Sequence, residues 1–225
     1  MLLQNGRMDQ NLFDLKEILR DGKKELIETN KLRENTQKSM RKTIRFSKQA
    51  ILSIHQKNFS ESKNLLRKAK ENIAKLQSIA INHPEVIFTG MYSAVLQEFC
   101  EANILLELIQ GKKLITPREL NVPYSEYILG LADVIGEYRR LSLDALREDF
   151  VEKGEKYLIK MEEIYLELQA MDEAYILVHG LRRKCDVARK IIESTRGDIT
   201  QAVRQKSLEN YLREVEKSQR KIKQA

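Results

Sequence analysis

The 225-residue chain has few of the residues that punctuate or cross-link other protein classes. It contains no tryptophan, three prolines, nine glycines and two cysteines. An all-β sandwich or barrel needs Gly and Pro at many turns, and three prolines cannot supply them. Two cysteines, Cys100 and Cys185, exclude a disulfide scaffold and a zinc site built from cysteines. We therefore expect an intracellular, reducing environment and a cytoplasmic location.

Long apolar runs are also missing. No run approaches the roughly 20 residues of a membrane span, and the N-terminus lacks the basic and apolar regions of a signal peptide. We expect a soluble protein with no membrane partner. Hydrophobic residues make up 42% of the chain, which is enough for a packed core. The net charge of +7 favours polyanionic partners such as nucleic acid.

Apolar residues recur every three to four positions along most of the chain, which predicts helices. The expected helices span about residues 9–57, 60–82, 84–109, 124–150, 151–171, 172–196 and 198–223. The segment 9–57 is either one long helix or two helices joined near Gly22 or Asn30. Other residues expected at helix ends or breaks are Ser60 or Ser62, Pro84, Glu148-Asp149, Asp172 and Gly197-Asp198. The sequence thus predicts an all-α fold of six or seven helices, forming one domain over residues 1–225.

Charge is unevenly distributed along these helices. Residues 85–173 contain 18 acidic and 9 basic side chains, so this middle segment carries −9 and the two flanking segments together carry +16. One interpretation is that the charges only solvate the helix surfaces and form pairs within each helix. The other is that basic helices face phosphates while the acidic middle has a separate task.

Four acids in this middle segment interrupt apolar stripes. Glu98 and Glu101 are three residues apart on one predicted helix, and Asp133 and Glu137 are four residues apart on the next. Each pair therefore shares a helix face with apolar residues. Carboxylates that face a core are costly unless they are paired or bind a metal. Pairing of one acid with Arg139 or Arg140 is the simpler alternative.

A divalent cation would relieve the repulsion among four converging carboxylates. Hard oxygen ligands favour Mg²⁺ or Mn²⁺ over zinc. Such a metal beside basic helices is typical of phosphodiester chemistry, because it activates water and neutralises charge on the phosphate. A ferritin-like di-iron bundle is the rival, but it requires Glu-x-x-His on two helices. None of the three histidines, His55, His83 and His179, follows a Glu at that spacing, and we assign them capping or surface roles.

Three segments resemble the translin family, in particular its translin-associated factor X branch. The segment VLQEFCEA (95–102) is similar to the branch pattern GLQEYVEA. The segment VPYSEYILGLADVIGEYRRL (122–141) resembles the family pattern VxDYLxGVADxxGExxR. Near the end, RKCDVARK (183–190) is similar to the family run LKYDVKK. The likeness is specific over about half of the chain and thin over the first part.

This resemblance implies the translin all-α bundle, assembled into closed, barrel-like octamers that bind single-stranded RNA and DNA. It also implies the Mg²⁺-dependent endoribonuclease branch, because its acidic catalytic positions match Glu98, Glu101 and Asp133, with Glu137 as the fourth carboxylate and metal ligand. Translin itself, the inactive branch, lacks the paired glutamates. Arg140 matches a basic position of the family.

We therefore predict an endoribonuclease that uses Mg²⁺ (or Mn²⁺) to cut single-stranded RNA within a barrel-like homo-oligomer. Single-stranded DNA is a further possible ligand, and an octamer or a hetero-oligomer with a translin-like partner is the expected assembly. The residues expected to contact the strand are Arg139, Arg140, Arg183, Lys184 and Arg189. One alternative is a non-catalytic single-stranded RNA/DNA-binding protein of the translin kind, and another is a plain helical scaffold.

Overall fold

The computed structural model describes residues 2–224, with the side chains of residues 14–171, 173 and 175–220. Residues 1 and 225, the ends of the predicted domain, lie outside it. Over the described residues all regular structure is helical, and the all-α prediction is confirmed. None of these helices combines the length and apolar character that crossing a bilayer requires. Six helices are long: α1 (Leu2–His55), α2 (Phe59–Ala80), α4 (Gly90–Ile109), α6 (Tyr124–Arg147), α7 (Val151–Gln169) and α9 (Leu181–Gln224). Three are short: α3 (Pro84–Ile87), α5 (Pro117–Leu120) and α8 (Asp172–Leu177).

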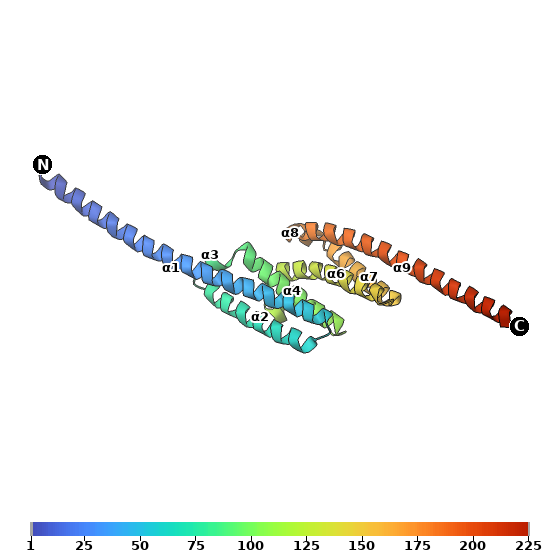
Figure 1. The fold of residues 1–225 in the computed structure, drawn as a ribbon. Coiled ribbons are helices and arrows are strands. Elements are labelled where there is room, and N and C mark those ends of the chain that lie inside the picture. Colours follow the sequence, from blue (N-terminus) through green and yellow to red (C-terminus); the bar gives the residue numbers. More distant parts are fainter. Residues whose placement is uncertain (1, 225) are drawn as a thin grey trace.

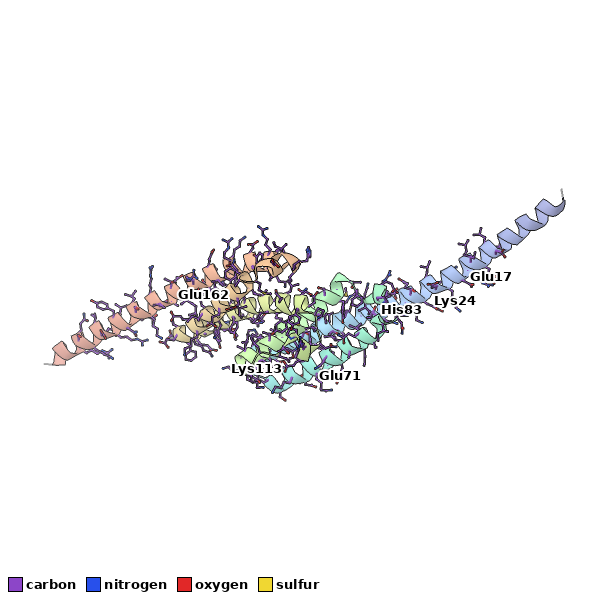
Figure 2. All side chains as sticks on the ribbon, turned by 180° about the vertical axis from the view of Figure 1, so that it is seen from behind. Glu17, Lys24, Glu71, His83, Lys113 and Glu162 are labelled. Carbon is purple, nitrogen blue, oxygen red and sulfur yellow. The ribbon has the colours of Figure 1, made fainter. Side chains whose placement is uncertain are left out.

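Helices α4 and α6 lie at the centre of the bundle. Helix α1 packs against α2 and α4, and α6 packs against α4, α7 and α9. Figure 1 shows that the first part of α1 and the last part of α9 extend beyond the bundle at opposite ends. Glu17 and Lys24 lie on the projecting part of α1 (Figure 2). The two central helices therefore come from the acidic middle of the sequence, and the long basic helices α1 and α9 pack against α4 and α6 respectively.

Helix α1 is held by one buried seam. The residues of this seam alternate between spacings of four and three: Thr36, Met40, Thr43, Ser47, Ala50 and Ile54. Ile51 and Ser53 are also buried and widen the face near the end of the helix. The helix runs without a break through Gly22 and Asn30, so the one-helix alternative is correct. A glycine inside a helix costs only about 1 kcal/mol relative to alanine, which is too little to end a helix of this length.

Helix α9 has the same kind of seam, formed by Leu181, Cys185, Ala188, Ile192, Thr195 and Ile199. The expected break at Gly197-Asp198 is wrong, because α9 continues through both residues. Asp198 forms an ion pair at 3.3 Å with Arg139 of α6, and Ile199 is buried. Tertiary contacts on both sides of Gly197 thus keep the helix intact despite its weak intrinsic propensity.

Several helix ends differ from the sequence-based expectations. Helix α2 begins after Asn58, whose side chain accepts a hydrogen bond from the Glu61 amide, so neither Ser60 nor Ser62 is the cap. The segment 84–109 forms two helices, because Phe88 and Thr89 leave helical geometry between α3 and α4. Asp172 is the first residue of α8, and its side chain lies outside the described ones. The break near Asp149 is confirmed, and this residue takes a φ of 63°.

Candidate active site

Glu98 and Glu101 on α4 and Asp133 and Glu137 on α6 form what we call the acid cluster. Helices α4 and α6 approach closely at Gly130, where a Cβ atom would lie 2.7 Å from Cys100 Cβ and 2.8 Å from the Gln97 carbonyl oxygen. This contact is one residue from Glu101 on α4 and three residues from Asp133 on α6. The absent side chain of Gly130 therefore allows the two acidic faces to meet.

Glu101 is the buried member of the acid cluster. Its residue surface is 8% exposed, and the pKa of its carboxyl group is raised to about 9. Burial is the largest cause, the negative charges of Asp133, Glu137 and Glu98 add to it, and Lys184 acts in the opposite direction. The four acids predicted from the sequence therefore interact with one another across α4 and α6.

Each of the other three acids faces a basic side chain from a flanking helix. Lys48 Nζ of α1 lies 3.2 Å from Glu98 Oε1, and His55 Nε2 of the same helix lies 2.5 Å from Glu137 Oε2. Lys184 of α9 forms an ion pair and hydrogen bond with Asp133. Basic groups from α1 and α9 thus cover the cluster from two sides.

The role assigned to His55 from the sequence is wrong. Its side chain is 5% exposed and directed at Glu137, so it is neither a helix cap nor a surface group. One signal for this existed in the sequence, because His55 lies four residues after Ile51 and therefore shares its helix face. The partner on α6 is 82 residues away in the chain, and no local pattern could identify it.

The acid cluster has the donor chemistry of a site for a hard divalent cation. It provides four carboxylates, and among the described contacts the buried Glu101 forms no ion pair. Within the described residues, no three acidic, histidine or cysteine side chains are gathered as a ready-made ligand set. The ion pairs account for this arrangement, because Glu98, Asp133 and Glu137 are each drawn toward a basic group. A metal would therefore compete with Lys48, His55 and Lys184 for these oxygens.

The five predicted strand-binding residues divide into three that are exposed and two, Arg139 and Lys184, that form ion pairs within the bundle. Arg140, Arg183 and Arg189 are exposed, as a phosphate contact requires. Arg139 is engaged inside the bundle: its guanidinium donates to Thr195 Oγ1 at 2.7 Å, to the Ile191 carbonyl at 3.4 Å, and pairs with Asp198. Arg139 therefore contributes to the packing of α6 against α9, and its contact with nucleic acid remains a prediction. Neither Arg139 nor Arg140 pairs with the acid cluster in the described contacts.

A small cavity joins the acidic and basic parts of this site. Its volume is about 220 Å³, and it lies between α6 and α9. Asp133, Arg183 and Lys184 line it together. A phosphate at this position would meet two basic side chains within reach of a cluster carboxylate. This cavity therefore brings a carboxylate of the acidic middle segment and basic side chains of a flanking helix together in one place.

Comparison with known proteins identifies the family of this chain. Residues 31–194 match the model of the translin family. The chain belongs to the translin family. The matched segment contains the whole acid cluster together with Lys48, His55 and Lys184. The assignment to the factor X branch and the one-domain organisation over residues 1–225 remain predictions.

Individual proteins and solved structures are similar to this chain over most of its length. The chain is 37% identical over 193 residues to an uncharacterized protein of Methanocaldococcus jannaschii. The aligned segment covers 85% of each sequence. The crystal structure of AfC3PO is similar with a TM-score of 0.70 and 33% identity, over 82% of this chain and 96% of that one. A structure of AfC3PO with duplex RNA matches with 32% identity and the same TM-score, over 82% and 95%. Apo-NeC3PO, at 22% identity and a TM-score of 0.71 over 82% and 96%, shows the shared fold.

Proposed function

We propose that this translin-family chain is a Mg²⁺-dependent endoribonuclease of the factor X branch, acting on single-stranded RNA. The observation that carries the proposal is the acid cluster itself, four carboxylates from α4 and α6 flanked by basic side chains of α1 and α9. The similarity to AfC3PO, for which a structure of a complex with duplex RNA is known, supports RNA as the ligand. The paired glutamates on α4 support the catalytic branch.

Glu98, Glu101, Asp133 and Glu137 would hold Mg²⁺ or Mn²⁺. The bound ion would supply a water of lowered pKa and neutralise charge on the scissile phosphate. The chain's own groups perform the remaining tasks. Arg183 and Arg140 bind the phosphates of the strand, and Lys48 and Lys184 move from their carboxylates to these phosphates. His55 keeps the Glu137 carboxylate oriented through the hydrogen bond between His55 Nε2 and Glu137 Oε2.

Cleavage of end-labelled RNA tests this function. We expect single-stranded RNA to be cut when Mg²⁺ is present and to remain intact in EDTA. Duplex RNA and single-stranded DNA of the same sequence serve as comparison substrates, since the AfC3PO complex contains a duplex. Intact single-stranded RNA at saturating Mg²⁺ would contradict the proposal.

The non-catalytic alternative has a specific observation in its favour. Three of the four acids already have basic partners, so their charges can be balanced without a metal. A translin-like binder of this kind would bind single strands without turnover, and its affinity would fall steeply with salt because each phosphate contact releases counterions. Salt-sensitive binding with no cleavage in Mg²⁺ would therefore select this alternative.

We also propose that the chain assembles into a homo-oligomer, with the barrel-like octamer implied by the resemblance as the specific form. Support comes from large apolar side chains that the single chain leaves exposed on its projecting helices. On α1 these are Leu15, Ile18, Leu19, Leu26 and Ile27, and on α9 they are Val203, Leu208, Tyr211 and Leu212. Burial of each such side chain contributes roughly 1.5–3 kcal/mol, so an assembly that covers them gains considerable free energy. A hetero-oligomer with a translin-like partner would cover the same faces.

Charged substitutions on the projecting part of α1 are expected to reduce the mass of the assembly. In the Leu19→Lys/Leu26→Lys variant, two side chains that are 63% and 73% exposed in the single chain become unable to enter an apolar interface. Light scattering coupled to size exclusion should show a smaller species than the wild type. Glu28→Lys, at an exposed position on the same helix, should keep the wild-type mass. Equal masses for all three proteins would contradict this role of α1.

His55 gives a second prediction about the site. The His55→Phe variant loses the donor to Glu137 Oε2, and we expect about 10- to 100-fold more Mg²⁺ to be needed for half-maximal cleavage. His55→Gln keeps an N–H donor and should recover much of the loss. Thermal melts of both variants in EDTA separate this effect from unfolding. Unchanged Mg²⁺ dependence in a folded His55→Phe protein would show that His55 does not position Glu137.

A further inference from the structure

A second cavity lies beside the acid cluster, and we call it the side cavity. Its volume is about 470 Å³, within the range of about 300–1,000 Å³ that is typical of small-molecule pockets. Residues of α4, α6, the end of α8, the loop between α8 and α9, and the start of α9 line it. Lys184 belongs to this lining and also pairs with Asp133. A strand positioned for cleavage at the acid cluster would therefore place a neighbouring nucleotide at the side cavity.

One wall of the side cavity is a hydrogen-bonded trio of Ser93, Gln97 and Glu126. Ser93 Oγ donates to Glu126 Oε2 at 2.8 Å. Gln97 Nε2 donates to the same carboxylate oxygen at 2.8 Å and to Ser93 Oγ at 2.9 Å. A carboxylate oxygen only accepts hydrogen bonds, so the Gln97 atom beside it is the amide nitrogen. The trio thus uses its hydroxyl proton and both amide protons internally.

The remaining polar atoms of the trio are acceptors, and Ser125 adds one hydroxyl group to the lining beside them. Gln97 Oε1 and Glu126 Oε1 have no donor among the hydrogen bonds described for residues 14–171, 173 and 175–220. Both belong to side chains that line the side cavity. A ligand that fits against this wall must therefore present hydrogen-bond donors, because an acceptor there would be left unpaired and repelled.

The other side of the cavity carries the opposite chemistry. His179, Arg183 and Lys184 line it, and all three offer N–H donors suited to an anion. The ligand should therefore combine an anionic group with an edge of donors, and a nucleotide has both. Among the bases, guanine presents two adjacent donors, N1–H and N2–H, on its Watson–Crick edge. Uracil presents one N–H between two carbonyl oxygens, which would face acceptors on this wall.

We propose that the side cavity is a base-recognition subsite that binds guanine of a single-stranded RNA next to the point of cleavage. This inference rests on the proposed function for the identity of the ligand. Unstacked bases of single strands are read by hydrogen bonds to their Watson–Crick edges. Glu126 and Gln97 accept the two guanine donors, while Arg183 and Lys184 bind the adjoining phosphate. The subsite makes the choice of cleavage position depend on the base beside the acid cluster.

Binding in EDTA tests the subsite without cleavage. The probes are fluorescently labelled short oligouridines that carry at one internal position guanosine, inosine or uridine. We expect the guanosine probe to bind about tenfold more tightly than the all-uridine probe, with inosine in between because it lacks the N2 amino group. A probe with 2′-deoxyguanosine should bind as tightly as the guanosine probe. If it binds no better than the all-uridine probe, the cavity recognises the ribose hydroxyl, and the assignment to the base is overturned.

Variants of the trio test whether its acceptors cause the preference for guanosine. Glu126→Gln introduces amide protons where acceptors stood, and it should abolish the preference for guanosine while leaving affinity for the all-uridine probe within about twofold. Ser93→Ala frees one Gln97 proton and should weaken the preference. Glu155→Gln, an exposed position on α7, should behave as the wild type. Equal affinities of all probes for the wild type would overturn the subsite alone, whereas failure of every probe to bind would also overturn the proposed function.

Discussion

Replacing Glu101 by glutamine is expected to lower the rate of RNA cleavage by more than about 100-fold while binding of the strand stays within about twofold. Loss of a group that only supports a metal ligand typically costs about 10- to 100-fold, so loss of a ligand should cost more. Glutamine has nearly the same shape as the protonated acid, and Glu101 is buried whereas Arg140, Arg183 and Arg189 are exposed. Single-turnover cleavage and anisotropy measure the two quantities separately.

Glu107 provides the matched control for this experiment. It lies six residues later on α4 and faces Lys112 at 3.9 Å instead of the acid cluster. Glu107→Gln should therefore cleave at the wild-type rate. A Glu101→Gln protein that cleaves as fast as the wild type would remove Glu101 from the site.

The Glu101→Gln substitution should also change how the stability of the metal-free protein depends on pH. Burial and three neighbouring acids raise the pKa of Glu101 from 4.5 to about 9 in the folded state. Between these values the folded protein retains a proton that the unfolded chain has lost, so stability falls as pH rises through this window. Glutamine cannot lose that proton. In EDTA, the melting temperature of Glu101→Gln should therefore exceed that of the wild type near the upper end of the window, and this advantage should shrink as pH falls toward 4.5.

Gly130→Ala is expected to destabilise the fold by about 2–3 kcal/mol. The added Cβ would lie 2.7 Å from Cys100 Cβ and 2.8 Å from the Gln97 carbonyl oxygen, and the second of these is backbone that cannot rotate away. Helices α4 and α6 must separate to relieve the overlap, and overpacking of this kind costs about 1–3 kcal/mol or more. For a chain of this size the melting temperature should fall by roughly 4–12 °C.

Gly136 on the same helix is the matched control, because a Cβ there would have nothing within 4 Å. Gly136→Ala should be neutral or should stabilise α6 by about 0.5–1 kcal/mol, as alanine is the better helix former. Equal melting temperatures for Gly130→Ala and the wild type would contradict the close α4–α6 contact on which the acid cluster depends.

Local spacing was sufficient to predict the all-α fold, the approximate positions of the long helices and the acid pairs. Glu98 with Glu101 and Asp133 with Glu137 share helix faces because of residue spacing alone, and the structure places each pair where its own helix meets the other. Periodicity also predicted helical structure over residues 9–57, although it left open whether one helix or two helices form there. These features depend on neighbours within a few residues, which is the range that a sequence pattern can report.

Contacts between distant segments were beyond the reach of such patterns. His55 and Glu137 are 82 residues apart, and nothing near His55 identifies its partner. Arg139 looks like its exposed neighbour Arg140 in the sequence, yet it is held by Thr195 and Asp198 of α9. The same contact carries α9 through Gly197-Asp198, where local propensity alone predicts a break.

A titration with Mn²⁺ tests most directly whether the acid cluster is a divalent-cation site. Mn²⁺ bound to protein is followed by electron paramagnetic resonance for the wild type, Asp133→Asn and the Glu107→Gln control, without RNA and at one ionic strength. We predict saturable binding to the wild type and the control, and loss of that binding in folded Asp133→Asn protein. Equal Mn²⁺ binding by all three proteins would contradict the account.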